Sequence, residues 1–208
     1  MPLTRQQILE AALELADERG VEALKMRDLG GALGVEGMAL YRHVANKDDL
    51  LDGVLDLVLA EAEPPSPDGY WADTVRESAL SVHRALERHP WATRLLLDPE
   101  RVRPALLAYG EALLARLGEA GFSEAETYHA YHVLDAHIFG YALWLAMHNF
   151  TSEEQVAAAR RVAERLQSGG YPQFAKHIGQ HRAEGPHRDV DAFEIGLDLI
   201  LKGLDSKT

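Results

Sequence analysis

The chain has 208 residues, of which 47% are hydrophobic, enough for one well-buried core or for one small and one larger domain. Cysteine is absent, which excludes disulfides, thiolate metal sites and a cysteine nucleophile and fits a reducing compartment. The formal net charge of −12 opposes binding to nucleic-acid phosphates. No basic segment leads into an apolar run, and no stretch of 18 apolar residues occurs, so we expect a cytoplasmic protein that does not enter the membrane.

The N-terminal third of the chain has the pattern of a helix-turn-helix. Thr4 and Gln7 form a capping box that begins a first helix, and Gly20 ends it. Residues 26–47 then predict two short helices around a turn at Gly34, where glycine meets the backbone demand without steric cost. The apolar positions that would hold these two helices together are Leu29, Leu33, Val35 and Leu40. An ordinary helical hairpin has the same spacing and is the alternative.

The second helix of this motif, about residues 36–43, leaves an outward face. Its members are Glu36, Gly37, Met38, Ala39, Arg42 and His43. In a helix-turn-helix protein such a face enters the major groove of DNA. Two alternatives stay open: Met38 could pack inward, and Tyr41 in the same helix could be purely structural.

The remaining elements are also helical. Asn46 caps a helix of about residues 47–61, which has too many apolar residues for one stripe and is expected to contact two neighbours. The proline-rich residues 63–69 then break the chain. Further helices are expected over about residues 70–89, 104–120, 124–148, 151–168 and 189–204. The sequence therefore predicts an all-α protein with a helix-turn-helix domain (1–46), a linking helix (47–62) and a larger helical domain (63–208).

Short runs between residues 4 and 58 occur in a distinctive order. They are Ile8-Leu9-x-Ala-Ala-Leu-x-Leu-Ala, Arg19-Gly20-Val21-Glu22-Ala23-Leu24, Arg27, Leu33-Gly34-Val35, Leu40-Tyr41-x-His43-Val44 and Asn46-Lys47-x-x-Leu50-Leu51. In this order and spacing they resemble the DNA-binding domain of the TetR family of bacterial repressors. The resemblance implies that Tyr41 and Lys47 hold phosphates and that Arg27 can reach the groove. Gly37, Met38 and Ala39, at the base-reading positions, are less polar than in well-known members, so the operator sequence is not predicted.

The last helix resembles that of the tetracycline-repressor subgroup. The run is Ala192-Phe193-x-x-Gly196-Leu-x-Leu-Ile-x-x-Gly203-Leu204. Together with the first resemblance, it implies that residues 1–46 are a DNA-binding domain and residues 63–208 a ligand-binding and dimerisation domain. The resemblance implies a homodimer, in which this helix and the long apolar helix before it form a four-helix interface. The candidate interface residues are Phe193, Ile195, Gly196, Leu199, Ile200 and Gly203. A dimer would bring two recognition helices to the half-sites of a pseudo-palindromic operator, about 34 to 36 Å apart. Burial of this helix within its own monomer is the alternative.

A regulatory pocket for a small-molecule effector is expected inside the C-terminal domain. Its candidate residues are His83, Leu86, Trp91, Leu95, His137, Tyr141, Trp144 and His148. The last four lie at i, i+4, i+7 and i+11, on one face of a helix. A packed core or a dimer contact with satisfied histidines is an equally good interpretation.

Histidine pairs also raise the question of a metal. His129 and His132 are three residues apart and His177 and His181 four apart, but two ligands do not make a site. Residues 91–97 depart from the magnesium arrangement of the tetracycline repressors, so we expect no metal and no cofactor. The leading hypothesis is a ligand-responsive transcriptional repressor, released from its operator by a small molecule. The alternatives are a helical small-molecule carrier without DNA binding and a metal-dependent enzyme, although no complete catalytic motif is present.

Overall fold

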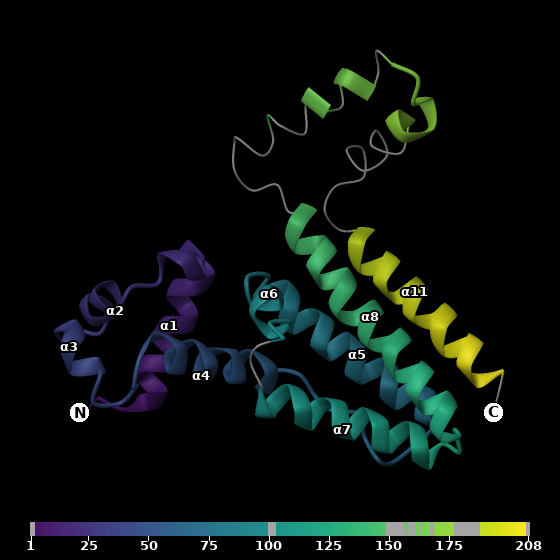
Figure 1. Cartoon of the computed structure of the whole chain (residues 1–208), viewed down its shortest axis with the longest axis horizontal. Helices are drawn as coiled ribbons and strands as arrows, with labels where there is room; N and C mark the ends of the chain where they lie inside the picture. The colour runs from purple at the N-terminus through teal and green to yellow at the C-terminus, as the bar shows by residue number, and fades with distance from the viewer. Residues whose placement is uncertain are drawn as a thin grey trace.

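A computed structural model describes residues 3–99, 103–148, 157, 161–162, 164–166, 169–176 and 188–206, without the side chains of residues 148 and 188–191. Every regular element in these ranges is a helix, which confirms the predicted all-α class. Figure 1 shows a small group of helices at the N-terminal end and a larger group beyond it, which we call the head and the body. One helix, α4, runs from the head into the body.

The head contains α1 (Arg5–Arg19), a 3-10 turn η1 (Val21–Ala23), α2 (Met26–Ala32) and α3 (Gly37–Leu40). The capping box of Thr4 and Gln7 and the stop at Gly20 are confirmed. The second helix of the motif is shorter than the predicted residues 36–43. The amide of His43 bonds to the carbonyl oxygen of Leu40 at 2.9 Å, so the chain tightens into turns directly after Leu40.

Helix α4 (Lys47–Ala60) belongs to both halves of the molecule. Its first part, including Leu50 and Val54, packs in the head with Ile8 of α1 and Leu40 of α3. Its last part, from Leu55 on, packs in a second and larger hydrophobic cluster in the body. The expectation that this helix contacts two neighbours is therefore confirmed, and one continuous helix connects the two clusters.

The body is built from α5 (Trp71–Arg88), α6 (Ala92–Leu96), α7 (Pro104–Glu119), α8 (Glu124–His148) and α11 (Arg188–Asp205). The bounds of α5, α7, α8 and α11 lie within one or two residues of the predicted ones, because the caps and apolar spacing that defined them are local; α6 was not predicted. Helices α8 and α11 lie alongside one another, and both pack against α5 (Figure 1). The helix predicted at about residues 151–168 falls mostly outside the described residues. Among the helices described, none is long and apolar enough to cross a membrane.

Candidate nucleic-acid interface and regulatory core

One glycine lets the helices of the helix-turn-helix approach closely, and another forms the turn between them. A Cβ atom on Gly30 of α2 would lie 2.8 Å from the Gly37 nitrogen and 2.8 Å from the Val35 oxygen. The turn between the helices passes through Gly34, whose φ of 67° is a left-handed conformation that glycine adopts without strain. The predicted turn is therefore present, and close backbone contact fixes α3 against α2.

The surface formed by α3 and the ends of its neighbours is exposed and mixes apolar with polar side chains. Met38 is 74% exposed, so it does not pack inward, and Tyr41 is 43% exposed. The Arg27 side chain is 89% exposed. Glu36, Arg42 and Lys47 are also exposed, whereas Ala39 and His43 are half-buried. We call these eight residues the reading surface.

Gly37 has a different place from the one predicted. A Cβ atom at this position would lie 2.9 Å from the carbonyl oxygen of Met26, so Gly37 faces the backbone of α2. Its lack of a side chain serves the packing of the two helices. For this reason we leave Gly37 out of the reading surface, although its neighbours in sequence belong to it.

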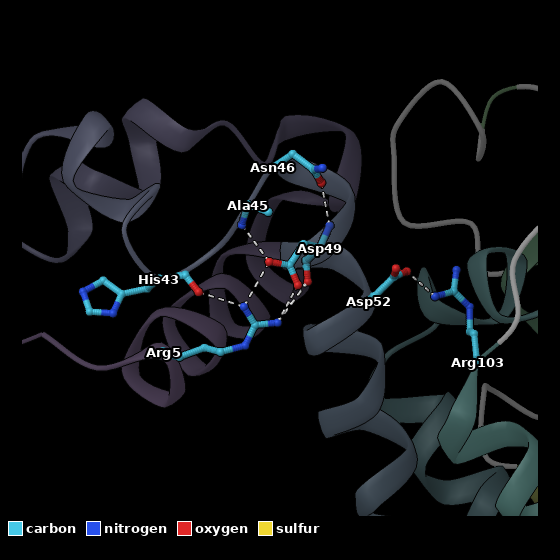
Figure 2. A network of polar contacts seen from close by, with 7 residues as sticks. All are labelled: Arg5, His43, Ala45, Asn46, Asp49, Asp52 and Arg103. Carbon is cyan, nitrogen blue, oxygen red and sulfur yellow. Dashed lines mark hydrogen bonds and ion pairs between the residues drawn. The ribbon is translucent and has the colours of Figure 1, made fainter.

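Arg5 and Asp49 organise the connection between α3 and α4, and sequence analysis did not identify either (Figure 2). Arg5 Nη2 lies 2.7 Å from Asp49 Oδ1, and Nη1 donates to the carbonyl oxygen of His43 at 2.9 Å and to Asp49 Oδ2 at 3.1 Å. Asp49 Oδ2 also accepts from the Ala45 amide at 2.7 Å. Asn46 Oδ1 caps α4 by accepting from the Asp49 amide at 2.8 Å, as predicted.

The charges of this network support each other. The side-chain hydrogen bond from Arg5, helped by the Ala45 amide, lowers the pKa of Asp49 below its usual value. The same hydrogen bond raises the pKa of Arg5. Both groups therefore stay charged at neutral pH, and their bidentate pairing fixes direction as well as distance.

Four of the predicted pocket residues gather around Phe193 of α11. The ring of His83 stacks on the Phe193 ring with 4.0 Å between centroids, and His137 stacks with 4.8 Å. The Tyr141 ring meets Phe193 edge-on at 5.4 Å, and Trp144 lies 5.8 Å from Tyr141. We call His83, His137, Tyr141, Trp144 and Phe193 the aromatic cluster. For His137, Tyr141 and Trp144 the convergence of this helix face is confirmed, and both imidazoles stack on the Phe193 ring.

His83 is buried without the partners that a buried imidazole normally has. It is 1% exposed, and within the described part of the chain neither ring nitrogen makes a hydrogen bond. Glu87 Oε1 lies 3.7 Å from Nε2. Burial, together with the nearby His137, lowers the pKa of His83 to about 4. The ring is therefore neutral at physiological pH.

The other predicted pocket residues lie elsewhere. Leu86 is buried in the body's hydrophobic cluster, and Trp91 and Leu95 pack at its edge. The Trp91 indole nitrogen donates to Asp17 of the head at 2.8 Å, and the Leu95 carbonyl oxygen accepts from Arg103. The side chain of His148 lies outside the described residues. The predicted set therefore divides between the aromatic cluster and the junction with the head.

A buried histidine joins the head to the body. His89, at the end of α5, has Nδ1 at 2.8 Å from Asp17 Oδ1 of α1 and Nε2 at 3.1 Å from Glu61 Oε1 at the end of α4. Arg88 also pairs with Glu61. On the other side of α4, Arg103 Nη1 lies 2.6 Å from Asp52 Oδ1 (Figure 2). Polar side chains of the body thus hold α4 on two sides.

The predicted dimer residues do not share one environment. Ile195 is 60% and Leu199 is 66% exposed, and Gly203 is exposed as well. Phe193 is fully buried in its own protomer, so its prediction as an interface residue needs correction. Gly196 faces His137, whose Cε1 would lie 2.5 Å from an added Cβ atom, so this glycine lets α8 and α11 approach within one protomer. Ile200 is half-buried against the body's cluster.

The structure describes one of the two histidine pairs considered for metal binding, His129 and His132. In the described ranges, no group of three or more histidine, aspartate or glutamate side chains is arranged to hold a metal ion. His129 and His132 are exposed on α8, and their rings each contact Tyr128. His177 and His181 lie outside the described residues.

A compact helix-turn-helix with an exposed reading surface, joined by a continuous helix to a larger helical body, defines the class of one-component DNA-binding regulators. Comparison with known proteins agrees with this class. The family described as "Bacterial regulatory proteins, tetR family" matches residues 8–54. The family described as "Tetracyclin repressor-like, C-terminal domain" matches residues 63–208.

Individual proteins show the same similarity along the whole chain. An HTH-type transcriptional regulator from Saccharopolyspora erythraea is 33% identical over 203 residues, covering 97% of this chain and 84% of the relative. The transcriptional repressor DrrR1 from Streptomyces coeruleorubidus is 31% identical over 214 residues, covering 98% of this chain and 77% of the relative. The structure of the TetR family protein ActR from Streptomyces coelicolor in complex with actinorhodin superposes with a TM-score of 0.74 at 29% identity. The match covers 100% of this chain and 97% of ActR.

The chain therefore belongs to the TetR family, as its N-terminal motifs suggested. It is a DNA-binding transcriptional regulator of that family. These relatives are transcriptional regulators, not enzymes.

Proposed function

We propose that the protein is a homodimeric repressor that holds a pseudo-palindromic operator through its reading surface and releases it when a small molecule binds in the body. The observation that carries this proposal is the exposure of Met38 beside Tyr41 and Lys47, on a helix-turn-helix fixed by backbone contact. An apolar side chain that is 74% exposed at the start of a recognition helix suits contact with thymine methyl groups.

Each residue of the reading surface has a proposed part. The Tyr41 hydroxyl and the Lys47 ammonium would hold phosphates and set the register on the duplex. Base edges would then be contacted by Met38 and Ala39 and by the polar side chains of Arg27, Glu36, Arg42 and His43. Because the protein as a whole carries a charge of −12, we expect weak binding to non-specific DNA.

We propose that α11 and α8 form the dimer interface. Support comes from the exposed apolar side chains of Ile195 and Leu199 on α11 and of Val133 and Met147 on α8. Gly203, with no described atom within 4 Å of an added Cβ, would allow close approach of a second helix. Phe193 and Gly196 instead have roles inside the protomer.

The effector would act on the aromatic cluster. His83 offers two ring nitrogens without hydrogen bonds in the described part of the chain, so a polar group on the ligand could satisfy them. A ligand shifts the equilibrium between two head spacings only by its difference in affinity for them, commonly about 1 to 3 kcal/mol. Helix α4 would carry the movement, since it packs in both hydrophobic clusters.

The same proposal includes a cytoplasmic location, the absence of catalytic activity, and domains of residues 1–46, 47–62 and 63–208. The family matches over residues 8–54 and 63–208 support the domain division. The regulator names of the relatives support the absence of enzymatic activity.

The decisive experiment measures binding of the purified full-length protein to DNA from around its own coding region. Fluorescence anisotropy at two salt concentrations would compare the wild type with Tyr41→Phe and Lys47→Ala. Matched controls are Tyr171→Phe and Lys176→Ala, which change exposed residues of the body in the same way. We expect binding that resists competitor DNA and is weakened by the two head variants only. Binding equal to that of random DNA, followed by an empty genome-wide selection for bound fragments, would overturn the proposal.

A further inference from the structure

The connection between α3 and α4, residues 41–46, carries the proposed phosphate contacts at its ends. The amides of Arg42, His43 and Val44 bond back to the carbonyl oxygens of Ala39 and Leu40. Tyr41 lies at its start, and Lys47 follows it as the first residue of α4. Any freedom in this segment would change the distance between these two side chains. What fixes the segment is therefore important for DNA binding.

Two side chains bind further backbone groups of this segment. Arg5 Nη1 donates to the His43 carbonyl oxygen at 2.9 Å, and Asp49 Oδ2 accepts from the Ala45 amide at 2.7 Å. Arg5 and Asp49 are paired with each other through the two terminal guanidinium nitrogens, Nη1 and Nη2. The two backbone groups are thus tied to one ion pair, which reaches from α1 to the first turn of α4 (Figure 2).

The packing beneath this ion pair explains why it can form. Gly53, one turn after Asp49, faces α1, and an added Cβ atom would lie 2.8 Å from Leu9 Cδ2 and 3.2 Å from Arg5 Nη2. The absence of a side chain at Gly53 lets α1 approach α4 closely. The Arg5 guanidinium then lies over the start of α4, directed at Asp49.

We propose that Arg5 is a positioning residue for operator binding: it holds the α3–α4 connection in place through Asp49 and the His43 carbonyl, and does not itself bind a phosphate. This inference deepens the proposed function, because it names a residue outside the reading surface on which that surface depends. Arg5 is the basic residue nearest the start of α1, so composition alone would assign it to the DNA backbone. Its hydrogen bonds direct it instead into the protein.

The salt dependence of binding separates the two roles. A residue that neutralises a phosphate contributes about 0.9 to the slope of log K against log salt, whereas a positioning residue contributes nothing to it. We would measure this slope for the wild type, Arg5→Ala, Arg5→Lys and Lys47→Ala, using a duplex selected by the full-length protein from a random library. Arg19→Ala is the control for charge, since it removes an exposed arginine at the other end of α1.

We expect Arg5→Ala to lower the affinity about tenfold, the equivalent of one charge-assisted hydrogen bond, with an unchanged slope. Arg5→Lys should rescue only part of this loss, because an ammonium cannot form the two parallel bonds. Lys47→Ala should lower the slope. All binding is measured at a temperature below the thermal denaturation of every variant, so that each variant is folded. A slope for Arg5→Ala that falls as much as that of Lys47→Ala, or an affinity equal to that of Arg19→Ala, would overturn the proposal.

A second measurement needs no DNA. Amide hydrogen exchange of residues 43–49 should be faster in Arg5→Ala and in Asp49→Ala than in the wild type and Arg19→Ala. Unchanged exchange in this segment would overturn the positioning role whatever the DNA result. If the wild type bound no DNA while exchange changed as expected, the repressor function would fail and the structural role of Arg5 would stand.

Discussion

The ring of Phe193 on α11 stacks on the ring of His83 on α5, with 4.0 Å between their centroids and 8° between their planes. His137 of α8 stacks on the same phenyl ring with 4.8 Å between centroids. Three helices of the body therefore meet at one side chain, which sequence analysis had assigned to the dimer surface. Phe193 instead packs among the side chains that we had expected to line a ligand pocket.

The first prediction concerns pH. The pKa of His83 is about 4 in the folded protein and 6.5 when unperturbed, so between these values the unfolded chain binds a proton that the folded protein does not. Stability from this residue is complete above pH 6.5 and is lost as the pH falls towards 4. Protonation of His83 in the unfolded chain should therefore lower the free energy of unfolding by about 2 kcal/mol at pH 5 relative to pH 7.5.

Urea denaturation at the two pH values measures this effect. His83→Gln, which cannot titrate, should have a smaller difference between pH 7.5 and pH 5 by about 2 kcal/mol. His129→Gln replaces an exposed histidine of α8 and should behave as the wild type. An equal pH dependence in the wild type and His83→Gln would contradict the prediction.

The second prediction uses two adjacent glycines of α2. An alanine at position 30 would meet backbone atoms of Val35 and Gly37 at 2.8 Å, which rigid helices cannot relieve. A Cβ atom at position 31 would have no described atom within 4 Å, apart from its two chain neighbours and the nearby backbone of its own helix. We expect Gly30→Ala to destabilise the protein by about 1–3 kcal/mol and Gly31→Ala to stabilise it by up to about 1 kcal/mol.

The melting temperature and the DNA affinity would be measured for both variants. Gly30→Ala should also weaken operator binding, because α3 would be displaced from α2. If the two variants had the same melting temperature and affinity, the close contact of the helices would not be what holds the motif together.

Local signals predicted most of the fold. The caps at Thr4 and Asn46 and the break over residues 63–69 defined the elements correctly, because each acts within one turn of helix. The end of α3 was wrong by a few residues, since the change to turns after Leu40 leaves no mark in the sequence. The exposure of Tyr41 and Lys47 followed from the family pattern.

Contacts distant in the sequence could not be predicted. Arg5 and Asp49 are 44 residues apart, and neither stands out from the other charged residues of the head. For α11 the difficulty was different, because apolar residues surround much of the helix. Phe193, Leu197 and Leu201, four residues apart, face the core, whereas Ile195 and Leu199 face outward. Only the packing of α11 against α5 and α8 distinguishes these two faces.

The third prediction concerns the junction of head and body. His89→Ala removes the polar bridge from α5 to Asp17 and Glu61, both of which keep other partners. We expect a loss of about 1–3 kcal/mol in the free energy of unfolding, measured in urea, because the buried space is left with fewer hydrogen bonds. Trp91→Phe removes only one hydrogen bond to Asp17 and should lose about 1 kcal/mol. A His89→Ala protein as stable as the wild type would argue against the bridge.

The last prediction tests the dimer surface. Leu199 is 66% exposed on α11, and a second copy covering this face would bury it. Leu199→Asp would then place an uncompensated charge in an apolar interface, which is strongly unfavourable. We expect the variant to sediment as a monomer in analytical ultracentrifugation at concentrations where the wild type is a dimer.

The matched control is Leu107→Asp, which changes a leucine that is 61% exposed on α7, away from the proposed interface. It should remain dimeric, because its charge would stay in water. The monomeric Leu199→Asp protein should also bind DNA far more weakly, since a single head cannot contact two half-sites one helical turn apart. Dimers of Leu199→Asp as stable as those of the wild type would place the interface on another face of the body.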